Sequence, residues 1–236
     1  MRILFILIIV GLITGFKSQN TKMKEEITIL QTADIHAYLN PHNELFVENN
    51  AIVFRKAGGL SHIKTLVDEI RKENQNGALF IDGGDLIQGS GESVLSEGKI
   101  FPPIIQQMNY DLLIPGNWEV IYGKKIMLDV MKHYKTNAIV ANMFDDKDQK
   151  PIFPPYWITE KKGVKLGFIA YNDPEVPIRQ NPMFSKGLVF TEIESNLKAL
   201  IQELKENQKV DVLFLVTHIG ISKQVLLSNN PAVKGV

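Results

Sequence analysis

The chain contains no cysteine among its 236 residues. This absence excludes disulfide bonds, thiolate metal ligands and a lipid-modified cysteine, so any metal site must use oxygen and imidazole donors. Excess positive charge is also absent, because 26 lysines and arginines balance 26 aspartates and glutamates. Without a basic stripe, a nucleic-acid polymer is not an expected partner.

Long apolar runs are scarce, and the N-terminal run of 14 uncharged residues, 3–16, is short for a membrane span. It follows Arg2 and precedes the small residue Ser18, a pattern typical of a secretory signal. We expect residues 1–20 to be a signal peptide. The protein is then exported to the periplasm, the cell surface or the medium, with no stable membrane association after cleavage. An uncleaved N-terminal anchor is the alternative.

The composition, 44% hydrophobic and 22% charged, is typical of a globular chain with a sizeable core. Apolar and β-branched runs predict strands at residues 26–33, 78–81, 112–114, 138–142, 156–159, 164–171 and 211–218. Helical spacing of apolar residues predicts helices at residues 58–74, 98–109, 124–134 and 192–207. Loops are expected at residues 41–57, 144–150 and 172–187. The length suits one α/β domain, taken as residues 26–236, or the larger part of two. The first strand–helix–strand unit predicts a parallel pair of strands with a right-handed crossover.

The central motif is the stretch 78–90, in which an apolar strand runs into Asp82, two glycines and Asp85. In open α/β sheets the functional groups lie beyond the carboxyl ends of the strands. Glycines there let the backbone and a metal ion approach closely. We therefore expect Asp85 at the rim of a sheet, where its two carboxylate oxygens can serve two metal ions.

Three other predicted strands end in groups that can bind metal. Asp34 and His36 follow the first strand at the i, i+2 spacing that points two side chains the same way. Asn117 follows the strand at 112–114, and His218 ends the strand at 211–218. Taken singly, each has a structural alternative: a capping aspartate, an exposed histidine, a turn asparagine or a packed histidine. Together they favour a shared site for manganese, zinc, iron or magnesium.

The order Asp-x-His, Gly-Asp, Gly-Asn and Thr-His closely resembles the calcineurin-like metallophosphoesterases, over residues 27–220. Within that family, the stretches 31–36 and 83–90 resemble the 5′-nucleotidase branch. The resemblance implies an α/β fold, a β-sandwich flanked by helices in four layers (α-β-β-α). It also implies an exported hydrolase of small phosphoesters, such as nucleoside monophosphates or cyclic nucleotides.

The resemblance also implies a role for each residue. Asp34 and His36 would bind one divalent cation, Asn117 and His218 a second, and Asp85 both. Manganese or zinc is favoured, with iron, magnesium and calcium as alternatives. A metal-bound hydroxide would attack phosphorus in line while the two cations stabilise the developing charge.

One position departs from the family motif. The usual Gly-Asn-His-Glu or Gly-Asn-His-Asp is here Gly116-Asn117-Trp118-Glu119. The family histidine lies near the phosphoryl group and can protonate the leaving group, whereas an indole only donates a hydrogen bond. Asn117 and Trp118 are therefore the candidate catalytic positions, and the enzyme is expected to be slow or to prefer a good leaving group. Tryptophan here resembles the thiosulfohydrolases of bacterial sulfur oxidation, which cleave a sulfur–sulfur bond on a carrier protein.

Length is the second departure. The family supplies two further ligands from a histidine-containing motif downstream of the Thr-His strand, and residues 219–236 contain no histidine. A C-terminal domain that grips the nucleoside is also usual in the branch. We therefore expect the domain to be incomplete at its C-terminus, with weak metal binding and little turnover from these 236 residues alone.

Three hypotheses follow from the residues and the resemblance. The first is an exported dinuclear phosphoester hydrolase of the 5′-nucleotidase or cyclic phosphodiesterase type. The second is a thiosulfohydrolase-like enzyme. The third is a non-catalytic module that binds metal or nucleotide.

Overall fold

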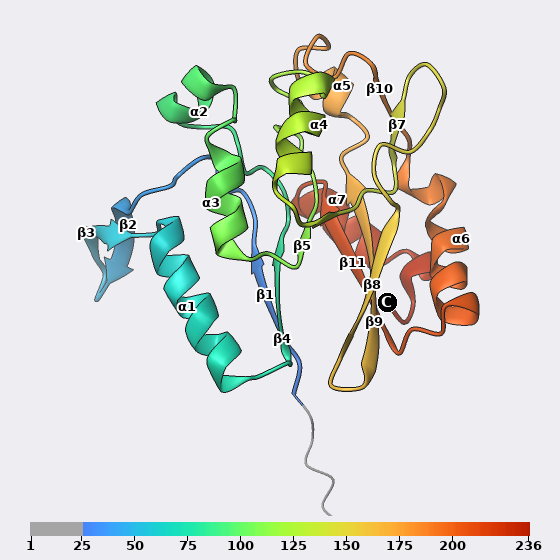
Figure 1. Ribbon diagram of the computed structural model, residues 1–236, viewed down its shortest axis with the longest axis horizontal. Coiled ribbons are helices and arrows are strands. Elements are labelled where there is room, and N and C mark those ends of the chain that lie inside the picture. Colours follow the sequence, from blue (N-terminus) through green and yellow to red (C-terminus); the bar gives the residue numbers. More distant parts are fainter. Residues whose placement is uncertain (1–25) are drawn as a thin grey trace, which may run out of the picture.

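Four parallel strands form the first sheet of the computed structural model, which describes residues 26–236 (Figure 1). The strand order is β1 (Thr28–Thr32), β4 (Ala78–Asp82), β5 (Leu112–Leu113) and β6 (Asn137–Ala138). All of β4 is buried, as its continuous apolar sequence predicts for a central parallel strand. The predicted parallel pairing of the first two strands is confirmed. The predicted signal peptide lies outside the described residues.

A second sheet contains β8 (Tyr156–Lys161), β9 (Val164–Asn172) and β11 (Val212–His218), in the order β11-β9-β8. The predicted hairpin between β8 and β9 is confirmed, and it turns at Lys162 and Gly163, both with positive φ. Strand β11 runs parallel to β9, with His218 opposite Asn172. Two strand ends of this sheet thus lie side by side.

The two sheets pack face to face through apolar side chains from both, such as Ile81 and Leu112 from the first and Phe168 and Val216 from the second. Helices α1 (Leu60–Glu73), α3 (Phe101–Met108) and α4 (Lys124–His133) cover the outer face of the first sheet. Helix α6 (Leu197–Gln202) covers the outer face of the second (Figure 1). The predicted α-β-β-α layering is confirmed.

The predicted strand at 138–142 is shorter than expected. Beyond Ala138 the backbone changes partners, because Val140 donates to the carbonyl of Pro154 and Ala141 to that of Ala170. These residues therefore cross from the first sheet to the second. The predicted helix at 192–207 is present as a 3-10 turn (Ile193–Ser195), α6 and a π turn (Glu203–Asn207).

Smaller elements fill the connections: α2 (Gly91–Ser96), β7 (Met143–Asp145), α5 (Val176–Arg179), β10 (Leu188–Phe190), α7 (Ile221–Ser228) and a 3-10 turn (Pro231–Val233). Two predicted loops therefore contain short elements, because the end of β7 extends into 144–150 and α5 lies in 172–187. In the part of the chain that the structure describes, no helix has the length and apolar character to cross a membrane.

The prediction of a loop at 41–57 is wrong. These residues form an antiparallel hairpin of β2 (His42–Glu48) and β3 (Ala51–Ala57). Asn49 and Asn50 both have positive φ, as a two-residue turn of the hairpin type requires. The asparagine and glutamate content suggested a loop, but short runs of apolar, β-branched and aromatic residues flank the Asn-Asn pair on both sides, which is a hairpin signal.

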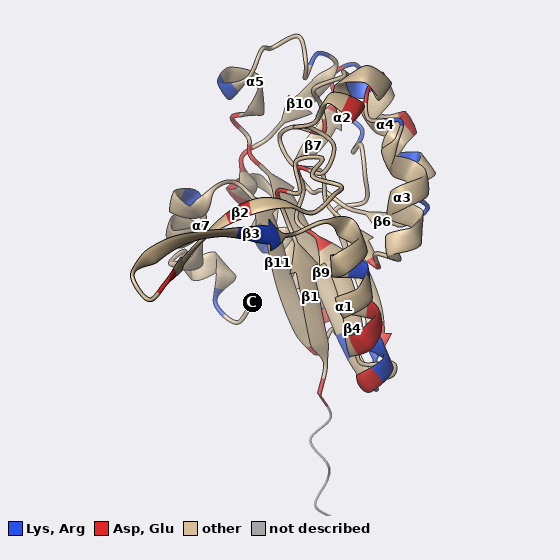
Figure 2. Cartoon of the chain, turned by 90° about the vertical axis from the view of Figure 1, so that its left-hand side faces the viewer, with Lys and Arg blue, Asp and Glu red and all other residues tan. Residues whose placement is uncertain are grey.

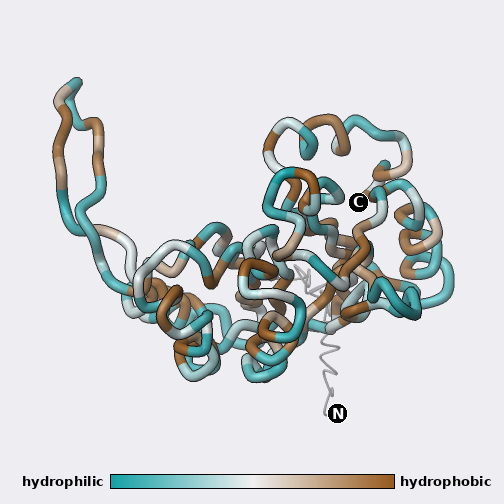
Figure 3. Tube along the Cα trace, turned by 90° about the horizontal axis from the view of Figure 1, so that it is seen from above, coloured by the Kyte–Doolittle hydropathy of each residue, from teal (hydrophilic) through white to brown (hydrophobic). Residues whose placement is uncertain are grey.

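This hairpin, called the arm below, extends away from the body (Figures 2 and 3). One face carries Leu45, Val47, Ile52 and Phe54, which are 46–70% exposed. On the other face Arg55 lies over the ring of Phe46, 3.9 Å from its centroid. The arm begins shortly after His36 and ends just before α1. It therefore projects from the body beside the strand ends.

A fully buried carboxyl group, Asp82, ends β4 inside the first sheet. It accepts hydrogen bonds from the Thr32 hydroxyl (2.6 Å) and the Gly84 N–H (2.8 Å). Burial raises the pKa of Asp82 to about 8, and the nearby charge of Glu119 adds to the rise. The folded state therefore keeps a proton on Asp82 that the unfolded chain releases near pH 4.

We predict that Asp82→Asn stabilises the protein at pH 8 but hardly at pH 4. A raised folded-state pKa gives wild type its full stability below pH 4 and removes it progressively as the pH rises to about 8. Asparagine does not ionise, so it avoids this loss. Thermal unfolding should show a gain of at least ~1 kcal/mol, or about 2–4 °C, at pH 8. Asp146→Asn, an exposed loop change, is the control. An Asp82→Asn effect that is the same at both pH values would contradict the prediction.

Candidate metal centre

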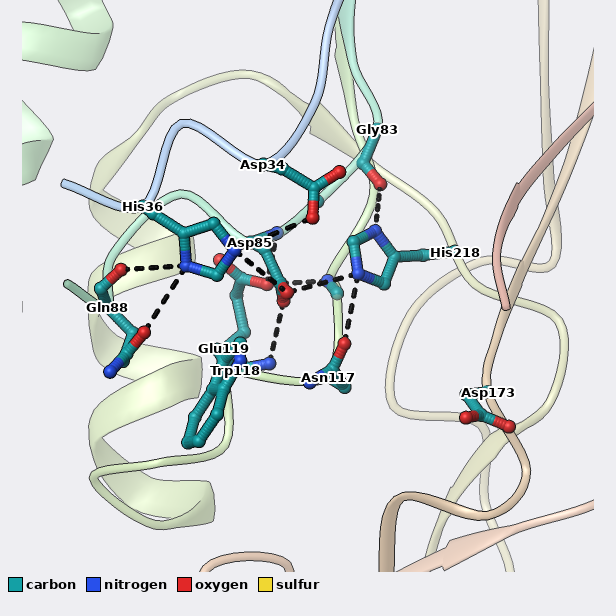
Figure 4. Close-up of polar contacts among 12 residues, drawn as sticks. Asp34, His36, Gly83, Asp85, Gln88, Asn117, Trp118, Glu119, Asp173 and His218 are labelled. Atoms are coloured by element: carbon teal, nitrogen blue, oxygen red, sulfur yellow. Dashed lines mark hydrogen bonds and ion pairs between the residues drawn. The ribbon is translucent and has the colours of Figure 1, made fainter. Parts of the chain in front are cut away.

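The carboxyl ends of β1, β4, β5 and β11 meet at one edge of the sandwich, and the five predicted metal ligands lie there together (Figure 4). Ligand atoms of Asp34, Asp85 and His218 all lie within 4.8 Å of one another. His36 Nε2 is 3.5 Å from Asp34 Oδ1 and 3.7 Å from Asp85 Oδ2. Asn117 Oδ1 is 3.0 Å from His218 Nε2. The sequence prediction of convergence is thus met for all five side chains.

Asp85 is the buried centre of this cluster. Its side chain is 3% exposed, against 59% for Asp34. One carboxylate oxygen, Oδ2, faces both histidines, 3.1 Å from His218 Nε2. The other, Oδ1, accepts the backbone N–H of Trp118 at 2.7 Å. Asp85 therefore lies between the Asp34–His36 side of the site and the Asn117–His218 side.

Both histidines are oriented by backbone carbonyl groups behind them. His218 Nδ1 is 2.8 Å from the carbonyl oxygen of Gly83, and His36 Nδ1 is 3.1 Å from that of Gln88. An Nδ1–H donated to a carbonyl leaves Nε2 as the free ligand atom, which is the usual arrangement of a metal-binding histidine. In both residues Nε2 is the atom that faces Asp85.

The loops need glycine to bring these groups so close. A Cβ on Gly116 would lie 2.3 Å from Asp85 Oδ1, and one on Gly84 would lie 2.6 Å from the nitrogen of Gly116. Asp34, His36 and Asp85 themselves have positive φ values of 55°, 48° and 61°. Such backbone conformations are costly outside glycine and concentrate at functional sites.

The Glu119 carboxylate joins the two loops through contacts that the sequence pattern did not predict. It is 3% exposed and accepts three backbone N–H groups: from Asp85 (2.9 Å), Leu86 (2.7 Å) and Gly116 (2.5 Å). Burial raises the pKa of Glu119, and the neighbouring charge of Asp85 raises it further. Glu119 is the last residue of the Gly-Asn-Trp-Glu motif, but only the fold shows which N–H groups it binds.

The electrostatics of the cluster stabilise a positive charge beside Asp85. Burial lowers the pKa of His218, but its hydrogen bond to Asp85 and the charge of Asp85 outweigh burial and raise the pKa to about 9. Carboxylate, amide and imidazole donors, with oriented histidines and two buried carboxyl groups nearby, fit a divalent cation. Asp173, another buried carboxylate, lies to one side of the cluster (Figure 4). It pairs with Arg179 and Lys223.

Trp118 lies beside the cluster (Figure 4). Its backbone contacts Asp85, and its side chain is half-buried. The chain has five histidines. The three outside the cluster make their own contacts elsewhere, because His42 bonds to Glu44, His62 to Gly58 and His133 to Asp129. None of these three histidines therefore lies beside Trp118 to replace the motif histidine as a proton donor.

Comparison with known proteins agrees with this geometry. The 5′-nucleotidase of Vibrio vulnificus (strain CMCP6) is 28% identical over 215 residues, which cover 90% of this chain and 38% of that protein. The 2′,3′-cyclic-nucleotide 2′-phosphodiesterase/3′-nucleotidase of Salmonella typhimurium (strain LT2) is 27% identical, covering 84% of this chain and 32% of that protein. The chain thus spans about a third of the length of these curated relatives.

Among solved structures, the sulfate thiohydrolase SoxB of Thermus thermophilus superposes with a TM-score of 0.80. The two are 19% identical, and the match covers 90% of this chain and 47% of the other. At this identity the likeness shows the fold alone. The family model of the calcineurin-like phosphoesterases matches residues 27–234, nearly all of the described chain. The protein therefore belongs to the calcineurin-like phosphoesterase family of metal-dependent phosphoester hydrolases and resembles its 5′-nucleotidase branch.

Proposed function

We propose that this protein is an exported hydrolase of nucleotide phosphoesters that works with two divalent cations, manganese or zinc. The observation that carries the proposal is the convergence of two carboxylates, two oriented histidines and one amide at the ends of four strands. The names of the similar nucleotidase and cyclic phosphodiesterase support nucleotides as the substrate class. The signal-like residues 1–20 support export.

Each half of the site would hold one cation. Asp34 and His36 would bind the first, Asn117 and His218 the second, and Asp85 both. Bound cations would supply Lewis acidity, which makes water nucleophilic near neutral pH and offsets charge on the phosphoryl oxygens. The chain's own part is to hold the ligands in place: the Gly83 and Gln88 carbonyls orient the histidines, and the Trp118 N–H orients Asp85.

Leaving-group protonation is the step that this chain lacks. Trp118 occupies the position at which the family motif has histidine, and an indole has no proton to release near neutral pH. We therefore propose a preference for esters whose leaving group departs without protonation. We also propose that a further domain completes the ligand set and grips the nucleoside, because the curated relatives extend well beyond the matched segment.

We predict that Asp85→Ala abolishes hydrolysis of AMP and of aryl phosphates by the protein expressed from its native gene with Mn²⁺. Removing this carboxylate removes the one group shared by both halves of the site. The measurement is phosphate release, with Asp146→Ala, an exposed loop carboxylate, as the matched control. If wild type hydrolyses no phosphoester with Mn²⁺ or Zn²⁺, or if Asp85→Ala keeps full activity, the proposed function is wrong.

Trp118 also supports a second candidate, thiosulfohydrolase-like cleavage of a sulfur–sulfur bond. A sulfur leaving group needs less help from an acid than a ribose oxygen does, so the absence of histidine matters less there. Sulfate release from a thiosulfonate conjugate without phosphatase activity would decide for this candidate. Nucleotide binding without any product would decide for the non-catalytic module.

We predict that Trp118→His increases AMP hydrolysis by about 10²–10⁴-fold, the usual contribution of a general acid. Hydrolysis of p-nitrophenyl phosphate should rise much less, since nitrophenolate leaves unprotonated. Trp118→Phe, which supplies no acid, is the control for packing changes. An equal rise for both substrates, or no rise for AMP, would show that the missing acid does not limit this enzyme.

A further inference from the structure

Two fully buried asparagines, Asn142 and Asn172, lie behind the candidate metal centre. Neither is among the predicted ligands. Asn172 ends β9, directly beside His218 in the parallel register, and Asn142 precedes β7. A buried amide is costly unless its donors and acceptors are all bonded. Where these bonds go therefore indicates what the amides do.

The Asn172 side chain bonds the loop that carries Asn117. Its Nδ2 donates to the carbonyl oxygen of Gly116 at 2.8 Å, and its Oδ1 accepts the N–H of Asp173 at 2.7 Å. The N–H of Gly116 is bonded to Glu119 at 2.5 Å. Gly116 is thus held on both sides, and the carbonyl that Asn172 holds belongs to the peptide unit that contains the nitrogen of Asn117.

Asn142 holds Asn172 in turn. Its Oδ1 accepts the Asn172 N–H at 3.0 Å, and its Nδ2 donates to the carbonyl oxygens of Asn172 (2.8 Å) and Thr191 (3.0 Å). The backbone of Asn172 is therefore fixed independently of the Gly116 contact. This leaves the Asn172 amide as a rigid donor aimed at one carbonyl group.

The other half of the site has separate supports. The Asp34 N–H donates to the carbonyl of Gly84 at 2.9 Å, and the His36 N–H to that of Asp85 at 2.9 Å. The His36 ring is oriented by Gln88. Among the described residues, Asn172 makes no hydrogen bond to Asp34, His36 or Gln88, so a change at Asn172 acts first on the Asn117–His218 half of the site.

We infer that Asn172 is a positioning residue that sets the orientation of the Gly116–Asn117 peptide and thereby the affinity of the Asn117–His218 half for its cation. The inference rests on the proposed metal centre. Rotation of this peptide would turn Asn117 away from His218 Nε2, now 3.0 Å from Asn117 Oδ1. It would also loosen the hydrogen bond from the Trp118 N–H to Asp85 Oδ1, which is not the oxygen that faces the two histidines.

The test compares Mn²⁺ binding by wild type and Asn172→Leu, a neutral change of similar size, in the protein expressed from its native gene. Titration followed by electron paramagnetic resonance should give two sites in wild type. In Asn172→Leu one site should weaken about 10–100-fold, as loss of a supporting hydrogen bond does, while the other stays within about 2-fold. Adding His36→Ala should remove the site that remains tight.

A matched control is Asn196→Leu. The Asn196 amide also donates to a backbone carbonyl, that of Ala141, at 2.7 Å, and it accepts the Tyr171 hydroxyl at 2.6 Å. Its loss should lower stability without changing either Mn²⁺ affinity. Asn172→Ala, which leaves room for a water molecule on the Gly116 carbonyl, should act in the same direction as Asn172→Leu but less strongly, and serves if the leucine variant does not fold.

A readout without metal keeps the inference separate from the proposed function. Hydrogen exchange of the Trp118 N–H should be faster in both Asn172 variants than in wild type and Asn196→Leu. Selective weakening of one site with faster Trp118 exchange supports the inference. Equal weakening of both sites, or equal effects of the Asn172 and Asn196 changes, overturns it. Wild type that binds no Mn²⁺ overturns the proposed function and this inference with it, even if Trp118 exchange responds.

Discussion

The buried carboxylate of Glu119 fixes the geometry on which the site depends. It accepts N–H groups from Asp85, Leu86 and Gly116, and so holds the loop after β4 against the loop after β5. Charge-assisted hydrogen bonds to backbone N–H groups are among the stronger ones in a protein interior. Burial and the nearby charge of Asp85 both raise the pKa of Glu119, so this arrangement has an electrostatic cost. A cation beside Asp85 would offset that cost, which connects the fold of these loops to the chemistry of the site.

The convergence of the candidate ligands could be predicted because parallel strands bring their ends to one edge of the sheet. Thr32 pairs with Asp82 and Asp82 with Leu113, so the loops that follow β1, β4 and β5 leave the sheet at one edge. His218 ends a strand of the second sheet, and the face-to-face packing of the sheets brings it within 3.1 Å of Asp85. Apolar runs that end in Asp, Asn or His carry this information locally, without any knowledge of the full topology.

Contacts between distant residues could not be predicted in the same way. The bond from Asn172 to Gly116 joins residues 56 positions apart, and nothing in the sequence around Asn172 indicates it. The pattern at 172–187 indicated only an irregular segment. The arm was missed for a different reason, since Asn49 and Asn50 form a turn that the composition of 41–57 concealed. Sequence patterns predict the local conformation and the buried face of each element. The hydrogen-bond partners of a side chain depend on the whole fold.

Two cations, one on either side of Asp85, are the proposed occupants of the strand ends. The most direct measurement is anomalous scattering at the manganese edge from crystals grown with Mn²⁺. Two peaks about 3.5–4 Å apart, the usual spacing of a two-metal site, with Asp85 between them, are the predicted result. One peak should lie at Asp34 and His36 and the other at Asn117 and His218. Absence of any peak at these residues, or manganese bound only elsewhere on the protein, would contradict the account.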